Sequence, residues 1–150
     1  KYLWWYPRSS SIESVGKGYK QMGSMITVSW QVFHGHYDIN WKLGYRRLVE
    51  DAIEWFMVKH DLETDKIFTV NLKNYEVMDC YGETYQDEKK NYVISLATDQ
   101  GLRDFLATLM HELVHVHQWE RDSWDGDGEK EAEEKQYKLA DKFWKEGMFK

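Results

Sequence analysis

The chain has 150 residues, enough for one hydrophobic core, and we expect residues 1–150 to form a single domain. Its one cysteine, Cys80, excludes an intramolecular disulfide framework and favours a reducing, cytoplasmic compartment. The formal net charge of −6 and the scarcity of adjacent basic residues argue against nucleic-acid binding. No apolar run is long enough to cross a membrane, and the sequence indicates no oligomeric state.

The first part of the chain predicts strands and one long helix. Residues 2–6 are rich in aromatic side chains and predict a strand that ends before Pro7. Residues 25–33 alternate in part between apolar and polar side chains and predict a second strand. A helix is expected from about residue 41 to residue 60. Its apolar residues recur at helical spacing: Leu48, Ala52, Ile53, Trp55 and Phe56.

From residue 66 to residue 98 the apolar period shifts toward two, which is typical of strands. Residues 66–72 predict one strand and residues 76–81 another, followed by a turn-rich stretch over 82–91. Residues 92–97 predict a further strand that leads directly into the next helix. Strands and helices in this order predict an α+β fold.

A wide apolar stripe predicts a helix after residue 101, with Thr98 or Asp99 as its N-cap. This helix contains the sequence His111-Glu112-Leu113-Val114-His115. Positions i and i+4 lie on one face of a helix, so both imidazoles can bind one ion. Glu112 is rotated by about 100° from His111, where it can take a proton from a zinc-bound water without binding the metal. The pattern is typical of a zinc metallopeptidase active site.

A catalytic zinc ion needs a third protein ligand. His117 lies six residues after His111, which is about 240° around the helix. We therefore expect His117 to be a solvated or second-layer residue and not a ligand.

The segment from Glu120 to Glu134 offers carboxylates instead. It holds eight acidic and two basic residues, which alone supply a charge of −6. A final helix is expected from 129 to 145, ended by Gly147. The apolar residues that share one face of this helix are Ala132, Leu139, Ala140 and Phe143.

The HELVH sequence followed closely by Glu129-Lys130-Glu131-Ala132-Glu133 resembles the gluzincin arrangement, in which HExxH is followed by E-x-x-A-[D/N/E] on the next helix. The resemblance implies that Glu129 is the third zinc ligand and that Glu133 supports a zinc-binding histidine. An alternative alignment of the family places the ligand at Glu131. The short spacing between the two motifs is similar to that of minigluzincins and small phage-type peptidases, and no histidine follows His117 as it would in the SprT-like branch.

The resemblance implies a zincin-like fold, with a small mixed or antiparallel sheet packed on the active-site helix, a preceding long helix and a C-terminal helix. It also implies that strand 92–97 is an exposed edge to which an extended peptide could pair, although the pattern fits an internal strand equally well. The expected function is hydrolysis of peptide bonds in a peptide or protein substrate by an endopeptidase that uses Zn²⁺, with Glu112 as the general base. The alternative is a non-catalytic zinc-binding domain that recognises a protein and retains the HExxH site.

Overall fold

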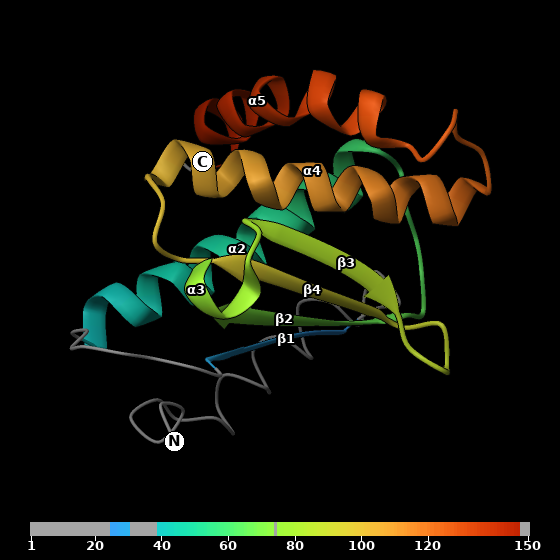
Figure 1. Ribbon diagram of the computed structural model, residues 1–150. Helices are drawn as coiled ribbons and strands as arrows, with labels where there is room; N and C mark the ends of the chain where they lie inside the picture. Colours follow the sequence, from blue (N-terminus) through green and yellow to red (C-terminus); the bar gives the residue numbers. More distant parts are fainter. Residues whose placement is uncertain (1–24, 31–38, 74, 148–150) are drawn as a thin grey trace.

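The computed structural model describes residues 25–30, 39–73 and 75–147 (Figure 1). Its elements follow in the order β1 (Met25–Trp30), α2 (Ile39–Lys59), β2 (Ile67–Lys73), α3 (Tyr75–Met78), β3 (Gly82–Gln86), β4 (Tyr92–Ala97), α4 (Leu102–Arg121) and α5 (Glu129–Glu146). The α+β class is therefore confirmed. The strand predicted at 2–6 and the end of the strand predicted at 25–33 lie outside the described residues.

The strands form one mixed sheet in the order β1-β2-β4-β3. β1 pairs with β2 and β2 pairs with β4 in parallel, whereas β3 pairs with β4 antiparallel. The expectation that residues 92–97 form an edge is wrong, because β4 lies between β2 and β3. Five of its six residues are buried, as is typical of a strand covered on both faces.

The predicted strand at 76–81 is also wrong. Residues Tyr75–Met78 form the short helix α3, and the strand lies further on, as β3, inside the stretch predicted to be turns. Sequence periodicity missed β3 because it is an edge strand of small and polar residues, more exposed at Glu83 and Tyr85 than at their neighbours.

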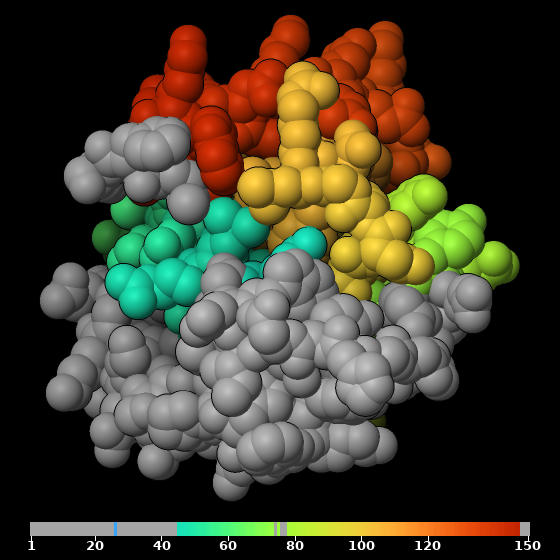
Figure 2. All heavy atoms as spheres, turned by 90° about the vertical axis from the view of Figure 1, so that its left-hand side faces the viewer, coloured from blue at the N-terminus to red at the C-terminus, as the bar shows by residue number. Residues whose placement is uncertain are grey.

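α4, which carries the HELVH sequence, lies on the sheet, and the other helices pack around it. α4 contacts β3 and β4, α5 packs along α4, and α2 contacts both β1 and α4. Figure 2 shows the atoms of α5 above those of α4, with α2 beside them. The apolar residues predicted on α2 are all buried, and Ala132, Ala140 and Phe143 of α5 are buried as predicted. Within the described residues, none of the helices combines the length and apolar character needed to cross a membrane.

The N-cap of α4 differs from the prediction. Gly101 occupies the N-cap position and makes no side-chain cap hydrogen bond. Thr98 and Asp99 are engaged elsewhere: the Thr98 hydroxyl donates to the carbonyl of Lys73, and Asp99 accepts from the backbone N–H of Tyr75. At the C-terminal end of α5, Gly147 is the C-cap residue, as predicted.

Candidate metal centre

His111 and His115 lie one turn apart on α4 with ring centroids 5.0 Å apart, and both face Glu129, the first residue of α5. The two Nε2 atoms lie 3.1 Å (His111) and 2.6 Å (His115) from the two carboxylate oxygens of Glu129. One ligand atom from each of the three residues lies within 4.8 Å of the others. The structure therefore brings together the three residues that the sequence nominated, in a group that could hold a metal ion.

The turn between α4 and α5 delivers Glu129 to the histidines. Asp122 ends α4 in the left-handed conformation, and Gly128 adopts a φ of 81° immediately before α5. The Asp127 carboxylate accepts a hydrogen bond of 3.0 Å from the backbone N–H of Glu129, which fixes the first turn of the helix. A Cβ at residue 128 would also lie 2.8 Å from Cδ of Gln118, so a larger residue there would displace the Gln118 amide.

Two glutamines hold the far nitrogens of the histidine rings. Gln136 Oε1 lies 2.7 Å from Nδ1 of His111, and Gln118 Oε1 lies 3.0 Å from Nδ1 of His115. The orientation of the Gln118 amide is set by its Nε2, which donates to the carbonyl of Gly128 and to Glu131, each at 3.0 Å. Each Oε1 therefore accepts a hydrogen bond from a protonated Nδ1.

The tautomer has a direct consequence for the centre. A neutral imidazole protonated at Nδ1 presents a lone pair at Nε2. Both Nε2 lone pairs are then directed at the carboxylate oxygens of Glu129, which is unfavourable unless a proton or a metal cation lies between them. Two imidazoles and a carboxylate are the ligand types that zinc takes in catalytic sites, and hydrogen-bonded outer nitrogens are usual for zinc-binding histidines.

Glu112 lies beside this group and is almost fully buried, with 5% of its surface exposed. Its Oε1 accepts a hydrogen bond of 2.5 Å from the Thr84 hydroxyl of β3. Burial raises the pKa of Glu112 above its ordinary value, while the Thr84 hydrogen bond and the two histidines act in the opposite direction. β3 approaches closely because residue 82 is glycine: a Cβ there would lie 3.0 Å from Glu112 Oε2.

The other candidate acids of the segment are placed elsewhere. Glu131 bonds Arg121 at 2.5 Å and Lys135 at 2.6 Å. These partners, with Gln118, outweigh its partial burial and lower the pKa of Glu131 to about 2. Glu133 is exposed, and the supporting position that the resemblance gave it is occupied by Gln136. The structure thus favours Glu129 over Glu131 and corrects the expectation for Glu133.

His117 lies away from the group formed by His111, His115 and Glu129, as its angular position predicted. It is partly buried, and its ring packs edge-on against His60 of α2 at a centroid distance of 4.9 Å. His60 is stacked on Phe56, and its Nδ1 donates to the Phe56 carbonyl at 3.0 Å. Burial lowers the pKa values of His60 and His117.

Sequence reasoning missed Gln118, Gln136 and Thr84. Gln118 lies three residues after His115, on the same helix face, and Gln136 lies two helical turns after Glu129. Spacing could therefore have nominated both glutamines. Thr84 carries no such signal, because its position depends on the pairing of β3 with β4.

Comparison of the chain with protein-family models, curated proteins and solved structures gives no match.

Proposed function

We propose that the protein is a zinc-dependent peptidase in which His111, His115 and Glu129 hold the metal ion. The observation that carries the proposal is the convergence of both Nε2 atoms on Glu129 while both Nδ1 atoms are held by amide oxygens. These three residues would hold the ion and would leave room in its coordination shell for water or substrate.

A zinc ion held there supplies Lewis acidity, which lowers the pKa of water and polarises a peptide carbonyl. Glu112 accepts the proton of the attacking water and delivers it to the leaving amine. The hydrogen bond from Thr84 leaves the second carboxylate oxygen of Glu112 available for this proton transfer. Burial of Glu112 supports the role, because it holds the carboxylate beside the three proposed ligands and away from bulk water.

The arrangement of the sheet supports a zincin-like fold and a peptide substrate. β3 is antiparallel, forms one edge of the sheet and lies against the helix that carries the histidines. An extended peptide can add to the outer edge of β3 by backbone hydrogen bonds, which is the role that the sequence had given to residues 92–97. A peptide paired along β3 would be held on both sides of the reacting bond, and this favours an endopeptidase.

Substitution Glu112→Gln tests the proposal, with Glu134→Gln as a control for loss of an exposed carboxylate. Both zinc-loaded variants and the wild type are assayed on a mixed library of unstructured peptides, and zinc content is measured in parallel. We expect Glu112→Gln to keep its zinc and lose hydrolysis, and Glu134→Gln to behave as wild type. A zinc-loaded wild type that cleaves no peptide would instead favour the non-catalytic zinc domain, and hydrolysis by Glu112→Gln would refute the role of Glu112.

A further inference from the structure

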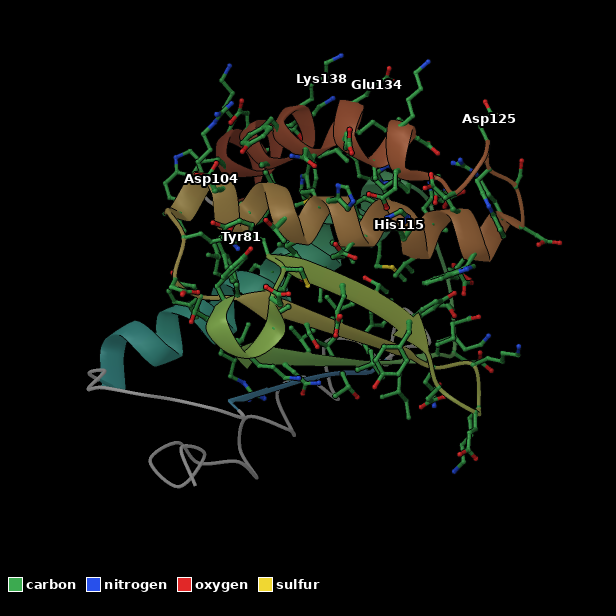
Figure 3. The ribbon with its side chains drawn as sticks, in the orientation of Figure 1. Tyr81, Asp104, His115, Asp125, Glu134 and Lys138 are labelled. Atoms are coloured by element: carbon green, nitrogen blue, oxygen red, sulfur yellow. The ribbon has the colours of Figure 1, made fainter. Side chains whose placement is uncertain are left out.

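A cavity of about 560 Å³ opens beside His111 and Glu112, toward the N-terminal end of α4. Tyr81 and Asp104, which are labelled in Figure 3, line the end of the cavity that lies away from His115. Tyr137 of α5 and Asp99 of the β4–α4 loop complete the outer wall. The cavity is large enough for any amino-acid side chain, and its inner wall is formed by the proposed base and one proposed ligand.

The outer wall is acidic and aromatic. Asp99 and Asp104 are both exposed, and none of the described residues that line the cavity is a lysine or arginine. One oxygen of each carboxylate accepts a local hydrogen bond, from the backbone N–H of Tyr75 (Asp99) and from the Tyr137 hydroxyl (Asp104). The second oxygen of each remains for a ligand. Tyr81 is 51% exposed, so its ring can pack against an aliphatic stem.

The Tyr137 ring already takes part in a cation–π contact with Arg103, which does not itself line the cavity. The guanidinium of Arg103 lies 4.5 Å from the centroid of the Tyr137 ring, a cation–π distance. Its charge is offset by a bidentate pair with Asp141, at 2.9 and 3.0 Å. At the outer wall, away from the proposed metal ligands, the local charge is that of the Asp99 and Asp104 carboxylates, which favours a positive occupant there.

The direction of β3 decides which residue of a peptide would reach the cavity. β3 begins at Gly82, which lines the cavity, and runs along α4 toward its C-terminal end (Figure 1). Antiparallel pairing is slightly more stable per residue than parallel pairing. A peptide paired antiparallel to β3 has its C-terminal part at the Gly82 end, so the residue after the scissile bond faces the cavity.

We propose that this cavity selects a substrate with lysine or arginine directly after the scissile bond. The ammonium or guanidinium group binds Asp99 and Asp104, and the aliphatic stem lies along Tyr81 and Tyr137. This inference rests on the proposed function for the position of the scissile bond, but the charge selectivity of the cavity can be measured without hydrolysis.

The binding test uses Glu112→Gln protein with zinc added and short alanine-based peptides that differ at one position: lysine, norleucine or glutamate. Norleucine keeps the length of the lysine stem without its charge. We expect lysine to bind more tightly than norleucine by about 1.5- to 5-fold for each carboxylate, with the difference falling as salt is raised. Asparagine at residues 99 and 104 keeps the oxygens that accept the local hydrogen bonds but removes both charges. The Asp99→Asn/Asp104→Asn double variant is therefore expected to lose this preference. Glu134→Gln, with the same change of charge on the outer side of α5, is expected to keep it.

Equal binding of lysine and norleucine peptides, or a lysine preference that survives in the Asp99→Asn/Asp104→Asn double variant, would overturn the inference. Neither result depends on catalysis, so both are separate from failure of the hydrolysis assay. The cleavage test digests a peptide library with wild-type protein and identifies the new termini by mass spectrometry. Product N-termini enriched in lysine and arginine support the assignment, whereas enrichment at the product C-termini, or no enrichment, contradicts it.

Discussion

Substitution Gly128→Ala tests whether Gln118 supports the proposed metal centre. A methyl group at residue 128 would lie 2.8 Å from Cδ of Gln118, which no real Cβ contact allows, so the amide must move. The same amide accepts from Nδ1 of His115 and donates to the carbonyl of Gly128. Movement of Gln118 therefore releases the ring of His115 and the start of the helix that carries Glu129.

The size of the effect has two separable parts. Alanine at a φ of 81° costs about 1–3 kcal/mol of backbone strain. Loss of an outer hydrogen bond to a metal-binding histidine typically lowers metal affinity about 10- to 100-fold. Gly126→Ala is the matched control, because Gly126 also has a positive φ (57°) but nothing lies within 4 Å of a Cβ placed there.

Zinc affinity is measured by competition with a chelating dye, and the free energy of unfolding by urea denaturation of the metal-free proteins. Both variants are expected to be less stable than wild type, and only Gly128→Ala is expected to bind zinc more weakly. Gln118→Ala should lower zinc affinity to a similar extent without strain at residue 128. A folded Gly128→Ala protein with wild-type zinc affinity would refute the role assigned to Gln118.

Three further predictions concern single side chains. Thr84→Val is expected to reduce the hydrolysis rate about tenfold or more without changing zinc affinity, because it removes a hydrogen bond to the buried carboxylate of Glu112. Thr84→Ser should restore the rate, and a wild-type rate for Thr84→Val would contradict this prediction. Glu129→Gln is expected to lower zinc affinity far more than Glu131→Gln, as measured by dye competition, and the reverse order would exchange the two assignments. Burial lowers the pKa of His60 in the folded protein below its value of about 6.5 in the unfolded chain. As the pH drops below about 6.5, the unfolded chain binds this proton first, so the free energy of unfolding should fall. His60→Gln should show a smaller fall in urea denaturation at pH 5.5 against pH 7.5, and an unchanged pH dependence would show that His60 does not contribute.

The two histidines, Glu112 and the helices around them could be predicted because their signals are local. Helical spacing alone places His111 and His115 on one face and directs His117 away from it. The buried face of α5 is likewise visible as an apolar period, and Glu129 at its first turn followed from the motif that the chain resembles. In each case the information lies within a few turns of one helix.

The missed features of the sheet depend on contacts between distant segments. β3 has no alternating apolar pattern to reveal it, and it becomes an edge strand only through its pairing with β4. The internal position of β4 follows from the same pairing. Gln136, and not Glu133, lies beside His111, because the ring of His111 is level with the residue two helical turns after Glu129. Spacing within α5 places Gln136 on the same face as Glu129, but the residue that reaches His111 also depends on how α5 packs on α4.

We propose that His111, His115 and Glu129 together bind one zinc ion, and a crystal structure of zinc-loaded protein tests this without relying on hydrolysis. Diffraction data are collected on both sides of the zinc absorption edge. We expect an anomalous peak about 2.0–2.2 Å from both Nε2 atoms and from an oxygen of Glu129. A well-ordered, zinc-loaded crystal with no peak between these three side chains, or with the ion bound by Glu131 in place of Glu129, would contradict it.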